Sequence, residues 1–208
     1  AAVARIFALK GRPADHPLIV HLGDATWLAR WSRTVDPRAE ALARAFWPGP
    51  LTLIVPRAAH VSDAVTGGQD TIGLRVPDHP VALAVLRAFD GALAAPSANR
   101  FGHISPTTAE HVRREFGADL RVVLDGGPCD VGIESTIVDL SRETPRVLRP
   151  GRIAVAELEA VIGRVEVGAV AASPRVSGAL ASHYAPRTPA ELMARSSIKR
   201  AVGRADAE

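Results

Sequence analysis

The 208-residue sequence predicts an α/β fold, a twisted, mostly mixed or parallel open sheet with helices packed on it. Short apolar runs rich in β-branched residues alternate along the chain with segments of helical spacing. Hydrophobic residues make up 47% of the chain and charged residues 23%, which suffices for a core and differs from a disordered composition. Aromatic residues are only 4%, so Ala, Val, Leu and Ile must build that core.

In the first half of the chain, apolar spacing together with proline and glycine signals defines the expected elements. Val3, Ile6 and Phe7 are spaced as on one face of a helix. Asp36-Pro37 starts a second helix, because proline is favoured in a first turn, and Pro48-Gly49-Pro50 ends it. The expected elements are helix Ala1–Leu9, strand Pro17–Leu22, a helix from Pro37 to Phe46, strand Leu51–Val55 and strand Thr71–Val76.

The second half continues the alternation of helices and strands. A helix over Thr107–Phe116 would be capped by Thr107 or Ser105, with Glu110 completing an approximate capping box. The other expected elements are helix Pro80–Phe89, strand Gly91–Ala95, strands Arg121–Asp125, Ser135–Leu140 and Arg146–Leu148, and helix Val155–Ile162. Beyond Gly163 the pattern weakens, which predicts a domain over residues 1–163, a linker over 164–189 and an unrelated or remnant tail over 190–208.

Composition excludes several classes of protein. The single cysteine, Cys129, excludes a disulfide framework and a cysteine-built zinc site. No apolar run reaches the roughly 18 residues of a membrane span, and the first residues lack a signal-peptide pattern. We therefore expect a cytoplasmic protein without a membrane partner. The 25 basic residues are nearly all arginines spread along the chain, so charge alone does not predict RNA binding.

Four polar turns follow strand or helix ends, where open α/β sheets bind ligands. They are Lys10–Pro13, Ala95–Gly102 with the adjoining Ser105–Thr108, Gly132–Thr136 and Leu148–Gly151. Arginine beside glycine suits a polyphosphate, although basic residues and a glycine cap are also ordinary at a helix end. Arg75 lies within an apolar strand, and a buried guanidinium needs a partner such as a substrate carboxylate. His21 ends another strand, where a histidine is more often a structural residue than a ligand.

Six segments in this order resemble the threonylcarbamoyl-AMP synthase family, which has the YrdC-type fold. They are KGRPADHPLIVHL (Lys10–Leu22), FWPGPLTLIVPR (Phe46–Arg57), TIGLRVPDHP (Thr71–Pro80), APSANRFGHISPT (Ala95–Thr107), GIESTIVDL (Gly132–Leu140) and VLRPGRI (Val147–Ile153). The stretch Ser182–Pro186, with the letters SHYAP, resembles the interdomain linker of the longer, two-domain members.

The resemblance implies synthesis of L-threonylcarbamoyladenylate and pyrophosphate from L-threonine, bicarbonate or CO2, and ATP with Mg²⁺. The product would pass to the transferase machinery that makes N6-threonylcarbamoyladenosine at tRNA position 37, with a weak tRNA contact. Lys10 and Arg12 would be catalytic. The residues implied to bind ATP are Arg12, His16, Thr71, Ser97, Asn99, Ser105, Arg149 and Tyr184, and those implied to bind L-threonine are His21, Arg75, Ala95 and Ser135, with no protein metal ligand.

The chain departs from the family pattern at both ends. A strand and loop with a P-T-[DE]-T-x-Y-G-L type motif precede the first helix in the family, and here the sequence begins after them. The match also fades after Pro189. Alternative functions are an RNA-binding module of the same fold, a carbamoyltransferase segment of a hydrogenase-maturation protein, and an inactive remnant.

Overall fold

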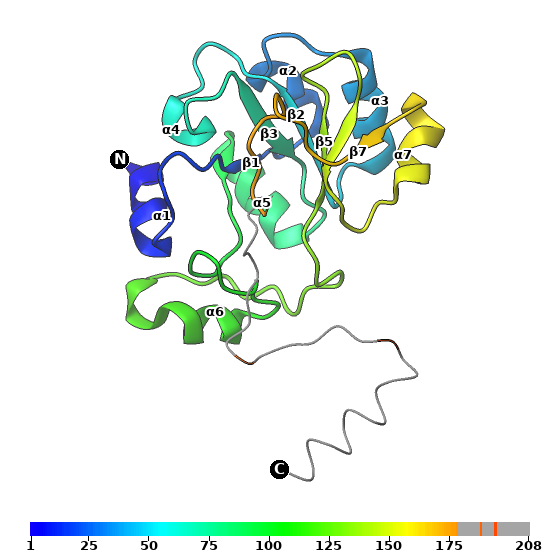
Figure 1. Ribbon diagram of the computed structural model, residues 1–208. Helices are drawn as coiled ribbons and strands as arrows, with labels where there is room; N and C mark the ends of the chain where they lie inside the picture. Colours follow the sequence, from blue (N-terminus) through cyan, green and yellow to red (C-terminus); the bar gives the residue numbers. More distant parts are fainter. Residues whose placement is uncertain (179–187, 189–193, 195–208) are drawn as a thin grey trace.

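A seven-stranded sheet organises the computed structural model, which describes residues 1–178, 188 and 194 (Figure 1). The strand order is β4-β1-β3-β2-β5-β6-β7. The strands are β1 Ile19–His21, β2 Leu51–Pro56, β3 Thr71–Arg75, β4 Leu93–Ala94, β5 Thr136–Asp139, β6 Arg146–Arg149 and β7 Glu166–Val167. The α-helices are α1 Ala2–Lys10, α2 Leu28–Trp31, α3 Pro37–Phe46, α4 Asp63–Thr66, α5 Pro80–Phe89, α6 Ala109–Phe116 and α7 Val155–Ile162.

The sheet is mixed, as the sequence predicts. The pairs β1–β3, β2–β5 and β6–β7 are parallel, whereas β1–β4, β2–β3 and β5–β6 are antiparallel. Most residues of the central strands β3, β2 and β5 are buried, because both faces of these strands are covered. β7 lies beyond Gly163 and was not expected, since two residues are too few for a recognisable strand pattern.

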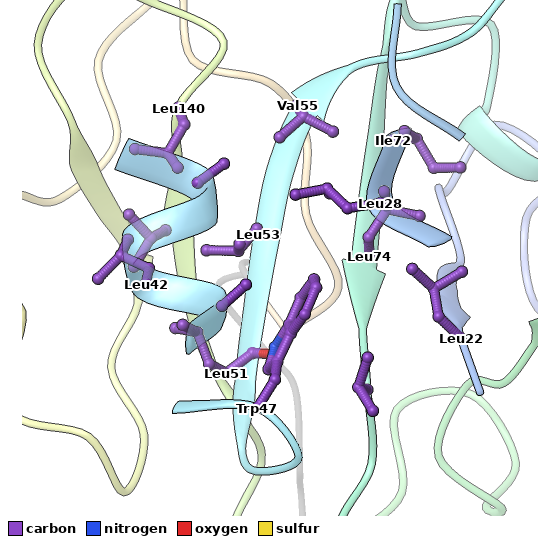
Figure 2. Close-up of a cluster of buried hydrophobic side chains, with 14 of the residues drawn as sticks. Leu22, Leu28, Leu42, Trp47, Leu51, Leu53, Val55, Ile72, Leu74 and Leu140 are labelled. Atoms are coloured by element: carbon purple, nitrogen blue, oxygen red, sulfur yellow. The ribbon is translucent and has the colours of Figure 1, made fainter. Parts of the chain in front are cut away.

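The main core lies on one face of the sheet, against α2, α3 and α7 (Figure 2). Leu53 of β2, Leu74 of β3 and Leu42 of α3 are fully buried there. Trp47, the largest of these side chains, is buried and donates its indole N–H to the carbonyl of Leu51 at 2.7 Å. Aliphatic residues dominate this core, in agreement with the low aromatic content.

The expected helices form, with local signals that fix their ends. The Asp36 carboxylate accepts from Arg38 N and caps α3, and Pro37 occupies the first turn. α1 ends at Gly11, whose φ of 62° is the left-handed conformation that favours glycine. Within residues 1–178, no helix has the length and apolar character needed to cross a membrane.

Two predictions around α6 are wrong. The helix begins at Ala109 and its cap is Thr108, whose hydroxyl accepts from His111 N at 3.2 Å. Neither Thr107 nor Ser105 is the cap, and Glu110 forms an ion pair with Arg114 in place of a capping box. Residues 121–125 form no strand. Val122 and Leu124 are 72% and 61% exposed, so the apolar run has no sheet neighbour that would bury it.

The opposite face of the sheet carries a second, smaller apolar cluster. Ile54, Ile137 and Leu148 pack there against Val176, which is only 7% exposed. Val176 belongs to Arg175–Ser177, a segment that crosses this face after the last strand and is here called the strap. The predicted linker therefore includes residues that lie on the sheet, while residues 179–187 and the predicted tail from 190, except residue 194, are outside the described residues.

Candidate functional site

An open pocket lies on the strap side of the sheet, where β1, β3 and β6 end. Its wall combines residues from several regions that are separated in the sequence. The lining residues are Arg12, Ile19, His21, Arg75, Ala95, Pro96, Ser97, Glu134, Ser135, Arg149 and Ser177. Seven of the residues singled out from the sequence thus meet in one place.

Strand alternation and register bring His21 and Arg75 together. The parallel pairing of β1 with β3 places Ile19 opposite Gly73 and His21 opposite Arg75, so all four side-chain positions share one face. The neighbouring residues Val20 and Leu74 point to the main core. Because side chains alternate along a strand, burial of one set directs the other set to the pocket face.

His21 is a neutral imidazole in this setting. Burial, and next the positive charge of Arg75, lower its pKa from 6.5 to about 3. Its Nδ1 is buried and has no hydrogen-bond partner within the part of the chain that the structure describes. A buried ring nitrogen of this kind can donate to or accept from a polar ligand group, depending on its tautomer.

Arg75 is held by its backbone surroundings. Its Nε donates to the Gly49 carbonyl at 2.9 Å, and its NH2 group lies 4.0 Å from Asp78. Burial lowers the Arg75 pKa from its usual value, although a guanidinium keeps its charge in proteins. The arginine is therefore a fixed cation at the end of β3.

Arg149 is fixed by Ser135 on the neighbouring strand end. Its Nε donates to the Ser135 carbonyl at 3.0 Å and its NH2 to the Ser135 hydroxyl at 2.9 Å. That hydroxyl also shares a 2.8 Å hydrogen bond with Thr52 on β2. Glu134 lies 3.8 Å from Arg149 and accepts a 2.6 Å hydrogen bond from Ser105. Ser105 thus lies against the pocket through Glu134.

Arg12 also lines the pocket, from the turn that follows α1. Its NH2 group donates to the Pro17 carbonyl at 2.8 Å and to the Ser177 hydroxyl at 2.9 Å. Its guanidinium lies over the Phe101 ring at 5.6 Å, and His16 meets the same ring edge-on at 5.3 Å. The structure therefore places His16 beside Arg12, outside the pocket lining.

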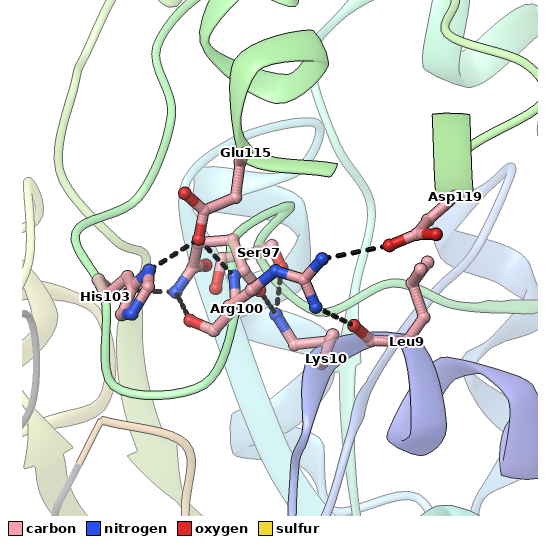
Figure 3. A network of polar contacts seen from close by, with 8 residues as sticks. Leu9, Lys10, Ser97, Arg100, His103, Glu115 and Asp119 are labelled. Carbon is pink, nitrogen blue, oxygen red and sulfur yellow. Dashed lines mark hydrogen bonds and ion pairs between the residues drawn. The ribbon is translucent and has the colours of Figure 1, made fainter. Parts of the chain in front are cut away.

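Lys10 and Asn99 hold the 97–103 loop through hydrogen bonds to its main chain, and Figure 3 shows Lys10 against Ser97. The Lys10 ammonium donates to the carbonyls of Ser97, at 2.5 Å, and of Asn99. The Asn99 amide donates to the carbonyls of Arg100 and His103, both at 2.8 Å. Both side chains are buried and neither lines the pocket. Burial, and next the charge of Arg12, lower the Lys10 pKa from 10.5 to about 8.

α6 supports the outer side of the same loop. Glu115 accepts from Arg100 N at 2.9 Å and contacts His103 Nδ1 at 2.6 Å, and Arg100 pairs with Asp119 at 2.9 Å (Figure 3). Ser97 is thereby held at the pocket wall by contacts on both sides of its loop.

Thr71 lies in an adjoining hollow between the sheet and the strap, which is also lined by Gly73, Val176 and Ser177. A β-carbon at Gly73 would stand 3.2 Å from Ile54 Cδ1, so glycine keeps this hollow open. Tyr184 is outside the described residues.

Sequence reasoning did not assign Glu134 and Ser177 to the site. Glu134 stands beside Ser135 in a segment already singled out, and a carboxylate opening a strand was an available signal. Ser177 carries no such signal, because its partners Arg12 and Arg149 lie far away in the sequence.

The pocket wall is cationic, with Arg12, Arg75 and Arg149 against the single carboxylate of Glu134. Guanidinium groups fixed in a pocket bind carboxylates and phosphates well. Residues 1–178 hold no cluster of three or more His, Cys, Asp or Glu side chains that could bind a metal ion. The arrangement suits an anionic ligand with both phosphate and carboxylate groups.

Comparison with known proteins agrees with this geometry. The sequence model of the Sua5/YciO/YrdC family, which carries the description "telomere recombination", matches residues 1–151. The chain belongs to the Sua5/YciO/YrdC family. Among its curated relatives are the threonylcarbamoyl-AMP synthases of Pyrococcus abyssi and Bacillus subtilis, each 42% identical, over 190 and 193 residues. The matches cover 89% and 90% of this chain and 56% of each relative, so the chain spans about half the length of these relatives.

Solved structures of the Sua5/YciO/YrdC family confirm the fold. The crystal structure of P. abyssi Sua5 complexed with L-threonine superposes with a TM-score of 0.90 at 39% identity, covering 99% of this chain and 63% of that one. Escherichia coli YciO superposes with a TM-score of 0.65 at 26% identity, covering 76% of each chain. The expected YrdC-like architecture is thus confirmed.

Proposed function

We propose that this chain forms L-threonylcarbamoyladenylate and pyrophosphate from L-threonine, bicarbonate or CO2, and ATP. The observation that carries the proposal is the gathering of Arg12, Arg75 and Arg149 around a neutral His21 in one pocket. Support comes from relatives named threonylcarbamoyl-AMP synthase and from a relative crystallised with L-threonine. The alternatives of an RNA-binding module and an inactive remnant do not require these fixed cations.

The two substrates are assigned to different parts of the pocket wall. L-Threonine would lie near the strand ends of β1 and β3, where the Arg75 guanidinium can receive its carboxylate and His21 one of its polar groups. ATP would lie toward Arg12 and Arg149. The pocket wall also offers Ala95 and Ser135 for threonine and Ser97 for ATP. Of the other residues that the resemblance implies for ATP, His16, Thr71, Asn99 and Ser105 lie outside the pocket lining, and Tyr184 is outside the described residues.

The reaction begins with attack of the threonine amine on CO2, which forms a carbamate and releases a proton. A carbamate oxygen then attacks the α-phosphorus of ATP, and the bond to pyrophosphate breaks. Negative charge shifts onto the pyrophosphate, and arginines held in place beforehand stabilise this charge without reorganisation. Arg12 and Arg149 are both held by hydrogen bonds to oxygen acceptors of the protein. Lys10 acts in this proposal by holding the loop that presents Ser97.

Mg²⁺ enters the proposal as an ion bound to the triphosphate of ATP. Glu134 is the one carboxylate that lines the pocket in the described part of the chain, and it already accepts from Ser105. One occupied carboxylate does not make a protein cage for a hard cation, which takes several oxygen ligands. No step of the reaction is derived through the ion.

The test is incorporation of radiolabelled bicarbonate into an adenylate by the purified 208-residue chain with ATP, Mg²⁺ and L-threonine. We expect product that depends on threonine, and loss of most of it in Arg75→Gln. Arg44→Gln is the matched control, because Arg44 is a mostly exposed residue of α3 whose ion-pair partner is Glu40. It should retain full incorporation.

ATP binding, measured by calorimetry on the same sample, separates the possible failures. Absence of both threonine-dependent product and ATP binding would refute the proposal. ATP binding without product would locate the defect in the threonine half of the pocket. Delivery of the product to a tRNA-modifying transferase, a weak tRNA contact and a cytoplasmic location complete the proposal.

A further inference from the structure

One residue of the strap, Ser177, contacts both Arg12 and Arg149 in the pocket. The Ser177 hydroxyl accepts from Arg12 NH2 at 2.9 Å and donates to the Pro17 carbonyl at 3.2 Å. The Ser177 carbonyl accepts from Arg149 NH1 at 3.0 Å. Ser177 therefore stands between two guanidinium groups that line the same pocket, Arg12 from the turn after α1 and Arg149 from the end of β6.

The two residues that precede Ser177 anchor the strap on the protein. Val176 is buried among Ile54, Ile137 and Leu148. Arg175 donates to the carbonyls of Asp15, at 3.1 Å, and Gly67, at 2.7 Å. Movement of the strap out of the pocket would expose the apolar Val176 side chain and break these hydrogen bonds. Displacement of Ser177 by a phosphate group of the ligand would therefore cost free energy.

The chemistry of the bridge preserves the positive charge of both arginines. A hydroxyl and a carbonyl oxygen orient guanidinium groups without neutralising them, whereas a carboxylate would form an ion pair and reduce their attraction for phosphate. The Arg12 and Arg149 guanidinium groups also repel each other, because both are positively charged. Their hydrogen bonds to Ser177 restrict the conformations of both side chains.

We propose that Ser177 is a positioning residue that sets the separation of Arg12 and Arg149 for binding the ATP polyphosphate. This inference rests on the proposed function. It makes the segment after the last strand part of the nucleotide site. The hydroxyl fixes Arg12, and the main-chain carbonyl fixes Arg149.

The experiment measures ATP and adenosine binding to the 208-residue chain by calorimetry, for the unmodified protein, Ser177→Ala, Ser177→Thr and Ser173→Ala. Loss of the hydroxyl should weaken ATP binding about tenfold, as expected for one hydrogen bond to a charged donor. Adenosine binding should not change, since adenosine has no phosphate for the arginines. Ser177→Thr retains a hydroxyl and should restore most of the affinity for ATP.

Ser173→Ala is the matched control, because Ser173 lies just before the strap and its hydroxyl accepts an exposed hydrogen bond from Val170 N at 3.0 Å. It should bind ATP normally. Unchanged or tighter ATP binding by Ser177→Ala would overturn the positioning role, and tighter binding would make Ser177 a competitor of phosphate. Equal losses for ATP and adenosine would also overturn it, because they would indicate a general structural defect. Absence of ATP binding by the unmodified chain would refute the proposed function itself, and this inference with it.

Discussion

Replacement of Lys10 by methionine tests whether this buried ammonium supports the pocket from behind. Methionine keeps the apolar stem packed at the end of α1 and removes the two hydrogen bonds to the carbonyls of Ser97 and Asn99. The expected result is a small change in global stability together with a large change in ATP affinity. The reason is that the cost of burying the ammonium offsets the gain from its hydrogen bonds, so their sum is small. The position of the Ser97 loop, in contrast, depends directly on those hydrogen bonds.

The magnitudes follow from the surroundings of the ammonium. At about 1.4 kcal/mol for each pH unit, a fall of the Lys10 pKa from 10.5 to about 8 means that burial disfavours the charged form by roughly 3 kcal/mol. Each hydrogen bond from a charged donor contributes about 1.5–3 kcal/mol. Lys10→Met should therefore lower the free energy of unfolding by no more than about 3 kcal/mol. ATP affinity should fall by about tenfold or more, because the Ser97 loop loses its anchor.

The assay combines urea denaturation with ATP calorimetry at pH 7 and pH 9. The folded state of the unmodified protein gives up the Lys10 proton near pH 8, and the unfolded state does so near 10.5. The unfolded state thus binds more protons in this window, and the stability of the unmodified protein relative to the Lys10→Met variant should rise with pH. Its advantage in ATP affinity should fall over the same range.

Two results would refute this reasoning. A loss of more than about 5 kcal/mol in unfolding free energy would mean that the hydrogen bonds far outweigh the cost of burial. Unchanged ATP affinity with a reduced turnover number would show that Lys10 takes part in the chemical step and does not act by supporting the loop.

Three further predictions concern stability. The pKa of His21 is about 3 in the folded state and 6.5 in the unfolded state, so the unfolded state takes up the proton first on acidification. Acidification from pH 7 to pH 5 should therefore lower the free energy of unfolding by about 2 kcal/mol in the unmodified protein and not in a His21→Asn variant. The same change in unfolding free energy for both proteins between the two pH values would contradict this. Gly67→Ala should lower the free energy of unfolding by about 2 kcal/mol or more, since its β-carbon would stand 2.1 Å from the Asp15 carbonyl oxygen. Gly68→Ala is the control, because Gly68 also has a positive φ but its β-carbon would meet no atom within 4 Å. Equal melting temperatures of the two variants would exclude the clash. Leu53→Ala removes a fully buried side chain and should cost about 2–5 kcal/mol in urea denaturation, and a loss below 1 kcal/mol would mean that the core collapses around the gap.

Most of the fold could be predicted because its elements carry local signals. The helix over Pro37–Phe46 has its acidic cap and first-turn proline in the sequence itself, and the strand at β2 is a continuous apolar run. The errors fall where apolar residues are not buried. The run over residues 121–125 reads as a strand, yet Val122 is mostly exposed, since burial depends on neighbours that the local sequence does not specify.

The candidate site was predictable in part for a similar reason. Arg75 within an apolar strand and His21 at a strand end were visible as unusual residues, and the parallel register then makes them neighbours. The role of Lys10 was not visible, because its carbonyl partners lie almost 90 residues away in the sequence and belong to the main chain, which gives no residue-specific signal. Ser177 was undetectable because its side-chain partner Arg12 lies 165 positions away in the sequence.

The bridge from Ser177 to Arg12 also sets an order of events during biosynthesis. The two residues are separated by 165 positions in the sequence. At about 5–20 residues per second, a ribosome needs roughly 10–30 s to add Ser177 after Arg12. The sheet through β6 can assemble on the emerging chain in that interval, while the pocket still lacks its strap. A nascent chain can therefore form this part of the sheet before its pocket is complete, and under the proposed function ATP would stabilise the protein only after the strap has left the ribosome.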